Sequence, residues 1–378
     1  MKNKSVVAFR PSFLAGNINI MFRPSIVVAF AYIMLLGLFT ITRGYSALDF
    51  VHLGTVWSQH NPAGTWGYDG QFYYQIARNP LEAFKYMDNA SFRYQHILYG
   101  VVVGALSLGQ PVLIPYMLLF VNLLSVVVSV EIVSRLLVKH GLSPWFSLAM
   151  GLYFGQAAAT MFDTAEPFTY LLVCIGVWML EEKHLTWAAL LMGLATLSRE
   201  IAVLFPAGYA LYFLIRKDWQ AFVRFTVLGI LPLLLFLLIL RFIFGATGVT
   251  FTRPLEHIPF AGIFFYTQVP RKFWLLILLM LLPTMGGWML IGRELLRRKF
   301  GQVFFVLLAN LALITFMSHS SYNDLVSSGR IATGLVLAVL LYGISTNNKF
   351  VLWGSQFYTL TFPVYIVAIL LHVPSFLA

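Results

Sequence analysis

The sequence carries little charge and almost no cysteine. Only 10% of its 378 residues are Asp, Glu, Lys or Arg, whereas 60% are hydrophobic, and the mean hydropathy is +0.82. This composition excludes an ordinary soluble domain. The one cysteine, Cys174, lies in an apolar run, so no disulfide can form within the chain.

Several common catalytic motifs are also missing. The chain has no Gly-rich loop ending in Lys-Ser/Thr, which argues against nucleotide hydrolysis by that route. It has no paired cysteines and no His-x-x-x-His array, which argues against a zinc site. A Gly-x-Ser-x-Gly elbow for a serine nucleophile is absent too.

What the sequence does contain is a series of apolar runs of membrane-spanning length. In lipid the backbone must satisfy its own hydrogen bonds, so runs this long predict helices. We expect an all-α polytopic transmembrane bundle of about 11 spans, within a range of about 9 to 13, that forms one integral-membrane domain over residues 1–378. The Gly-x-x-x-Gly pairs Gly100/Gly104 and Gly151/Gly155 indicate close helix packing.

The distribution of positive charge predicts the orientation. The segments assigned to the cytoplasm hold 15 of the 25 Lys and Arg residues but only 5 of the 14 Asp and Glu residues. The apolar run Ile26 to Thr42 reads as a retained signal anchor with a cytoplasmic N-terminus. We therefore expect a protein of the plasma membrane, and we expect its origin to be bacterial. Its net charge of +11 reflects topology and not a nucleic-acid partner.

The longest segment between spans, residues 43–110, is expected to be an extracytoplasmic first loop with helices lying at the interface. Gln71 to Asn79 is compatible with a helix that Pro80 ends, and Tyr94 to Leu108 is apolar enough to lie in the interface or re-enter the membrane. A structureless loop of this length is uncommon unless it is functional.

Polar chemistry is concentrated at Trp66 to Pro80, inside this loop. Aromatic faces stack on sugar rings, amides bond hydroxyls, and one carboxylate can accept a proton, so Asp69 is the candidate general base. The alternative for Asp69 is a helix N-cap, and the alternative for the aromatic residues is an interfacial belt. The candidate substrate-binding residues in this stretch are Tyr68, Gln71, Tyr73, Tyr74 and Arg78.

Later outward segments supply further candidates. Glu166 can contact substrate, and Arg199 and Arg330 can bind a phosphate. Helix-start chemistry is the alternative for Glu166. The alternative for the arginines is snorkelling, or pairing with Glu200 and Asp324. The candidates for a supporting shell are Asp49, His52, Asp163, Glu200, His319 and Asp324. No metal ligand is assigned, and a divalent metal stays open without a paired-carboxylate motif to hold it.

The ordered motifs resemble a known class. They are Tyr68-Asp-Gly-Gln-Phe-Tyr-Tyr74, Arg93 to Tyr99, Thr164 to Pro167, and Leu194 to Glu200. This set resembles the integral-membrane glycosyltransferases of the GT-C class, nearest to bacterial relatives of PIG-V-like mannosyltransferases, and it extends to about residue 215. The adjacent Asp-Glu pair or Asp-x-Asp of oligosaccharyltransferases and protein mannosyltransferases is missing from the first loop.

The resemblance implies an inverting transfer of a sugar, a hexose such as mannose, from a polyprenyl-phosphate donor to an extracytoplasmic acceptor glycan, lipid or protein in the cell envelope. Asp69 would be the loop carboxylate, Glu166 a second acidic position, and Arg199 and Arg330 the donor phosphate contacts. Two other functions stay open: a transporter or flippase for a lipid-linked or small solute, and a non-catalytic membrane assembly factor.

Overall fold

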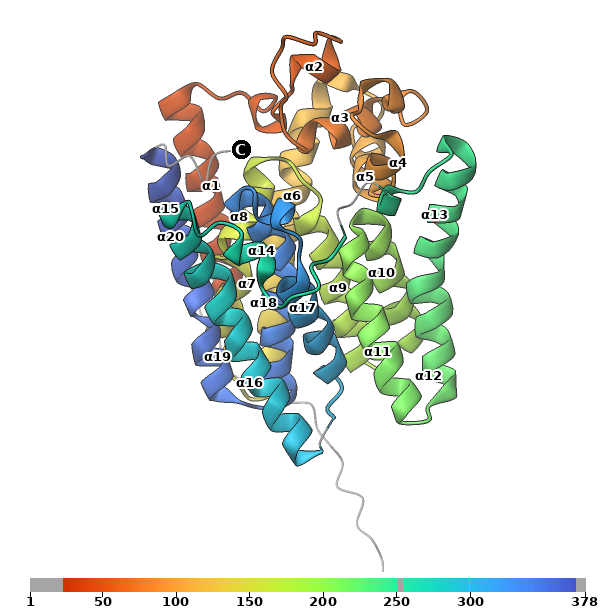
Figure 1. Ribbon diagram of the computed structural model, residues 1–378, viewed down its shortest axis with the longest axis vertical. Helices are drawn as coiled ribbons and strands as arrows, with labels where there is room; N and C mark the ends of the chain where they lie inside the picture. Colours follow the sequence, from red (N-terminus) through yellow and green to blue (C-terminus); the bar gives the residue numbers. More distant parts are fainter. Residues whose placement is uncertain (1–22, 251–253, 299, 372–378) are drawn as a thin grey trace, which may run out of the picture.

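A computed structural model describes residues 23–250, 254–298 and 300–371, and all regular structure in these ranges is helical. The helices run side by side in a bundle, with the first loop gathered at one end (Figure 1). This confirms the all-α prediction. Of the Lys and Arg residues that precede the expected signal anchor, Lys2, Lys4 and Arg10 lie outside the described ranges and Arg23 lies within them.

Six helical stretches are long and apolar enough to cross a membrane within the described residues. They are α1 (Pro24–Arg43), a stretch that ends with α6 (Ile114–Lys139), α12–α13 (Trp219–Arg224 and Leu231–Phe244), α15–α16 (Pro270–Leu276 and Leu282–Arg297), α18 (Leu325–Ser345), and α19–α20 (Lys349–Ser355 and Phe357–Leu370). The expected count of about 11 spans is not confirmed.

The other helices are shorter. Outside the first loop they are α7 (Leu148–Gly151), α8 (Phe154–Met161), α9 (Glu166–Glu181), α10 (Leu185–Ser198), α11 (Leu204–Ile215), α14 (Ala261–Phe264) and α17 (Phe304–Phe316). A helix of 14 residues is only about 21 Å long, which is less than the ~30 Å hydrocarbon core. Several runs that look like separate spans in the sequence are therefore too short to cross alone.

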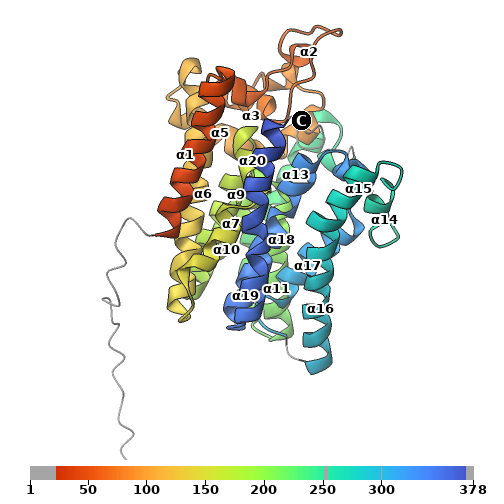
Figure 2. The ribbon, with the colours of Figure 1, turned by 90° about the vertical axis from the view of Figure 1, so that its left-hand side faces the viewer.

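α18 forms the centre of the bundle. In its most apolar window 89% of the residues are buried, compared with 17% to 44% in the other five long stretches. It packs against α8, α17 and α19, and it lies among the other helices in both views (Figures 1 and 2). A side chain on α18 near its first turns is thus enclosed by protein.

Residues 43–110 contain the short helices α2 (Thr55–Ser58), α3 (Gly70–Arg78), α4 (Ala90–Tyr94) and α5 (Ile97–Leu106). α3 packs on α5 through two glycines. A Cβ at Gly100 would lie 2.7 Å from the Ile76 side chain, and one at Gly104 would lie 2.6 Å from the Ala77 carbonyl oxygen. The first Gly-x-x-x-Gly pair therefore sets how closely α3 is held.

In the second pair, Gly155 lets α8 approach α18, and Gly151, at the end of α7, lies against α6 and α1. A Cβ at Gly155 would lie 2.2 Å from the carbonyl oxygen of Gly329, while one at Gly151 would meet the side chains of Val130 and Val28. Both pairs thus mark close packing, as predicted.

Candidate functional site

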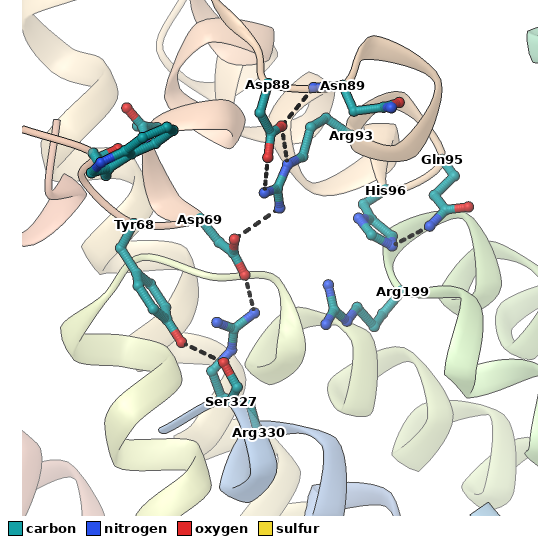
Figure 3. A network of polar contacts seen from close by, with 12 residues as sticks. Tyr68, Asp69, Asp88, Asn89, Arg93, Gln95, His96, Arg199, Ser327 and Arg330 are labelled. Atoms are coloured by element: carbon teal, nitrogen blue, oxygen red, sulfur yellow. Dashed lines mark hydrogen bonds and ion pairs between the residues drawn. The ribbon is translucent and has the colours of Figure 1, made fainter. Parts of the chain in front are cut away.

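Asp69 lies at the start of α3 but does not cap it. Its carboxylate makes no hydrogen bond to the α3 backbone. Instead, Oδ1 accepts from Arg93 Nη1 at 2.8 Å and Oδ2 accepts from Arg330 Nη2 at 3.0 Å. The N-cap alternative is therefore wrong, because both carboxylate oxygens are engaged by arginines (Figure 3).

The backbone around Asp69 is fixed by close contacts. Gly70 is required, since a Cβ there would lie 2.3 Å from the Phe162 carbonyl oxygen in the turn between α8 and α9. The side chain of Gln71 accepts from the Gly54 amide at 3.0 Å and donates to the Trp66 carbonyl at 2.9 Å. Gln71, expected to contact substrate, thus holds the loop in place.

Glu166 and Arg330 form the buried part of the site. Glu166 opens α9 and its side chain has 0% exposure. Its Oε1 accepts from Arg330 Nε at 3.0 Å and from Arg330 Nη2 at 2.9 Å. Because Arg330 Nη2 also donates to Asp69, this one guanidinium joins the loop carboxylate to the carboxylate inside the bundle.

Arg199 completes this group from the end of α10. Its Nε lies 3.4 Å from Glu166 Oε1, which is an ion pair without hydrogen-bond geometry. Arg199 Nε and Arg330 Nη1 are buried, and neither has a hydrogen-bond partner in the protein. The structure therefore brings together Asp69, Glu166, Arg199 and Arg330, and it leaves one N–H group of each of the two buried arginines without a hydrogen-bond partner in the protein.

The arginines set the charge of Asp69. Burial raises the pKa of this carboxyl, but the positive charges of Arg93, Arg330 and Arg199 outweigh burial and hold its pKa well below the usual range. The side chain keeps 26% of its exposure, so solvent reaches it from the loop side. Asp69 is consequently ionised and partly accessible, whereas Glu166 is enclosed.

Arg93 and Asp88 were given no role by the sequence reasoning. Arg93 Nε and Nη2 donate to the two oxygens of Asp88 at 2.7 Å and 2.6 Å, and its guanidinium lies 4.1 Å from the ring centre of Phe72. Asp88, on the exposed side, orients Arg93 toward Asp69. The signal for Arg93 was its position in the stretch Arg93 to Tyr99, but nothing there indicated its partner.

His96 was also missed. Its Nε2 bonds to Glu200 Oε2, and the Gln95 amide lies 3.2 Å from the same nitrogen. Burial lowers the pKa of His96, and this outweighs the opposing effect of Glu200.

The alternatives that paired Arg199 with Glu200 and Arg330 with Asp324 are wrong: the observed ion pairs of these arginines are with Glu166 and Asp69.

Tyr68 lies beside the network. Its hydroxyl is 2.9 Å from Ser327 Oγ and 3.5 Å from Asp324 Oδ1, and the Arg330 guanidinium lies 5.2 Å from its ring centre. Asp324 caps α18 by accepting from the Ser327 amide. Tyr68 therefore ties the loop to Ser327 in the first turn of α18, about one turn before Arg330 (Figure 3).

Other expected residues take different places. Tyr73 is buried against Tyr99, Tyr74 is partly buried, and Arg78 is exposed at the end of α3. Asp49 accepts from Ser46, and His52 packs on Phe162. Arg78 therefore takes no part in the Asp69–Glu166–Arg330 network.

Two more residues expected in a supporting shell differ in setting. Asp163 has φ +48° and is fully buried, and its carboxylate oxygens have no hydrogen-bond partner in the protein. His319 contacts Glu256 and the ring of Phe265 in the 254–322 region. In the part of the chain that the structure describes, no three His, Cys, Asp or Glu side chains gather closely enough to hold a metal ion.

Comparison with family models, curated proteins and solved structures finds no match to this chain. The similarity to GT-C enzymes therefore rests on the motifs alone. Function is therefore inferred from the geometry of the network around Asp69 and Arg330.

Proposed function

We propose that this protein is a membrane glycosyltransferase of the GT-C type, which moves a sugar from a polyprenyl-phosphate donor to an acceptor hydroxyl outside the cytoplasm. The observation that carries the proposal is the shared guanidinium of Arg330. It contacts an accessible, ionised loop carboxylate, Asp69, and a buried carboxylate, Glu166. Transfer from a lipid phosphate needs one base, cationic support for the leaving group, and positioning.

In the proposed reaction the acceptor oxygen attacks the anomeric carbon and its proton passes to Asp69. The bond from that carbon to the phosphate oxygen breaks, and its electron pair stays on the phosphate. A single displacement of this kind inverts the anomeric centre. The unpartnered N–H groups of Arg199 and Arg330 would stabilise the departing phosphate.

The ion pairs give this site a means of activating Asp69. With an arginine on each oxygen, Asp69 is a weak base. A donor phosphate that attracts Arg330 and Arg199 would weaken the hold of Arg330 on Asp69 and raise the pKa of the carboxyl. Asp69 would then accept a proton more readily when the donor is bound than when the site is empty.

We also propose that the protein lies in a bacterial plasma membrane, and the distribution of Lys and Arg favours an orientation with residues 43–110 outside the cytoplasm. Arg330 is the sixth residue of α18, about 8 Å from its start. A network near one end of the bundle suits a transferase that meets an aqueous acceptor, whereas a transporter or flippase favours charges near the midplane.

The decisive test replaces Asp69 with Asn, which keeps the size of the side chain and removes its charge. We expect transfer of sugar from a polyprenyl-phosphate donor to fall by about 100-fold to 10,000-fold, the usual contribution of a general base. Asp88→Asn is the matched control, because Asp88 touches Arg93 on its exposed side. It should retain most of the activity.

Full activity of Asp69→Asn in purified, normally folded protein would refute the assignment. Sugar turnover in detergent separates a transferase from a flippase, which needs two compartments. A copurifying polyprenyl lipid would exclude a purely structural assembly factor.

A further inference from the structure

Two apolar cavities lie between the α15–α16 stretch and the α19–α20 stretch. One, of about 340 Å³, is lined on one side by α16 residues and on the other by α19 and α20 residues, among them Leu282, Gly286, Gly354 and Phe357. The other, of about 440 Å³, lies between α15 and α20. Leu278 lines both, so the cavities form one groove, which we call the α16–α20 groove.

The α16–α20 groove follows the long axis of the bundle. From Val367 to Gly354 its α19–α20 wall covers 13 residues, or about 20 Å at the helical rise. This is about two-thirds of the ~30 Å hydrocarbon core. The opposite wall contains a π-helical turn, Ile277–Leu281, just before Pro283, which lacks an N–H to continue the α-helical ladder. Leu278, at the junction of the cavities, lies in that turn.

The two ends of the groove differ in charge. Among the described lining residues the one charged side chain is Arg271, which lies at the α15 end. The first loop begins after Arg43, the last residue of α1, and Arg43 donates to the Ile369 carbonyl near the end of α20. The Arg271 end of the groove is therefore at the same end of the bundle as the first loop and the candidate site (Figure 2). The groove thus fits a molecule with a long apolar body and one anionic head.

A short series of contacts links this end of the groove to the candidate site. Lys272, next to Arg271, donates to the Asn323 carbonyl at 2.6 Å. The adjacent residue, Asp324, lies beside the hydroxyl of Tyr68, and the ring of Tyr68 lies under Arg330. These contacts connect the Arg271 end of the groove, through Asp324 and Tyr68, to Arg330 of the candidate site.

We infer that the α16–α20 groove holds the isoprenoid chain of the donor, with its phosphate directed toward the Arg271 end. This inference rests on the proposed function and adds to it the place of the lipid. A polyprenyl phosphate has one chain and one anionic head, which matches one groove with one cationic end. A membrane phospholipid has two chains and is the competing occupant.

Two glycines allow the groove to be filled without disturbing the fold. A Cβ at Gly286 or at Gly354 would have no atom within 4 Å, although both residues line the groove. Leucine at either position would therefore project into the groove. Gly292, also on α16, has equally open surroundings but lies outside the lining of both cavities. Gly292→Leu is the matched control for the same change on the same helix.

The test uses a polyprenyl phosphate with a diazirine near the far end of its chain. The detergent-purified full-length protein is irradiated with this probe, and the labelled peptides are mapped by mass spectrometry. We expect labels at 278–290 and 350–358 in the natural protein. Labelling should fall by about tenfold or more in Gly286→Leu and Gly354→Leu, corresponding to a loss of about 1.4 kcal/mol or more, and should be unchanged in Gly292→Leu.

Equal labelling of Gly286→Leu and Gly292→Leu would overturn the inference, provided that both melt at the same temperature. Displacement of the probe by phosphatidylglycerol as readily as by unlabelled polyprenyl phosphate would overturn the choice of an isoprenoid. Labelling requires no turnover, so the proposed function can fail separately. Labels in the groove without sugar transfer would refute the transferase alone, and transfer with labels elsewhere would refute the groove alone.

Discussion

Glu166→Gln tests the central ion-pair network of the bundle. The carboxylate is fully buried and accepts two hydrogen bonds from Arg330, with Arg199 3.4 Å away. Glutamine preserves the shape and one acceptor but removes the charge. Arg330 would keep only Asp69 as an ionic partner, and Arg199 would lose its ion pair.

The cost of this change follows from burial. Removing one partner of a buried ion pair typically costs about 3–5 kcal/mol, and the acceptor that glutamine retains places Glu166→Gln near 3 kcal/mol. For a chain of this size about 2 °C of melting temperature corresponds to 1 kcal/mol, so we expect a decrease of about 6 °C. Arg330→Met should cost as much or more, since it leaves Glu166 buried beside Arg199 alone.

The double variant Glu166→Gln/Arg330→Met supplies the decisive comparison. With both charges gone, no buried carboxylate is left at position 166, although Asp69 keeps only Arg93 as an ionic partner. The loss should therefore be smaller than the sum of the two single losses by about 2 kcal/mol. Melting is followed by intrinsic tryptophan fluorescence of detergent-purified protein at one scan rate. Strictly additive losses would show that the two residues do not stabilise each other, and would refute this reasoning.

Two further predictions concern Asp69 and the contact between α8 and α18. Because the pKa of Asp69 is lowered in the folded protein, its contribution to stability is complete above the unfolded value of about 3.9 and is lost as the pH falls through the lower folded value. The difference in melting temperature between the natural protein and Asp69→Asn should stay constant from pH 7 to about pH 5 and shrink below about pH 4; a decline centred near pH 6 would contradict it. Gly155→Ala should lower the melting temperature by about 2–6 °C, because its Cβ would meet the Gly329 carbonyl oxygen at 2.2 Å and overpacking costs about 1–3 kcal/mol. Gly37→Ala, which meets no atom within 4 Å, is the control and should leave it unchanged.

The helical class followed from composition, but the number of spans did not. Hydropathy detects apolar runs, whereas a span also needs an unbroken helix. The run around α8 and α9 is interrupted by a turn at Asp163, which takes a left-handed conformation. The run around α10 and α11 is broken at Arg199. Both breaks lie in segments that were expected to separate spans, but the helices on either side are only 8 to 16 residues long. A hydropathy pattern does not give the length of each helix.

For the candidate site too, the sequence predicted some features and not others: it indicated the charged residues but not their partners. Asp69, Glu166, Arg199 and Arg330 could be chosen because charged groups near the ends of apolar runs are costly unless they have partners. Their partners could not be chosen, since the Asp69–Arg330 contact joins residues 261 positions apart. Gln71 was misassigned because its neighbours in sequence are polar and aromatic, whereas its amide is used to hold Gly54 and Trp66.

The position of Arg330 on the most buried helix has a consequence for biosynthesis. Asp69 and Glu166 are synthesised 261 and 164 residues before the guanidinium that pairs with both. Until α18 has been inserted, Glu166 has only Arg199 as a partner and the centre of the bundle is missing. A nascent chain that stops before α18 would thus contain Glu166 without the two hydrogen bonds from Arg330. The central helix of the bundle and the ion-pair network are therefore put in place by the same late step.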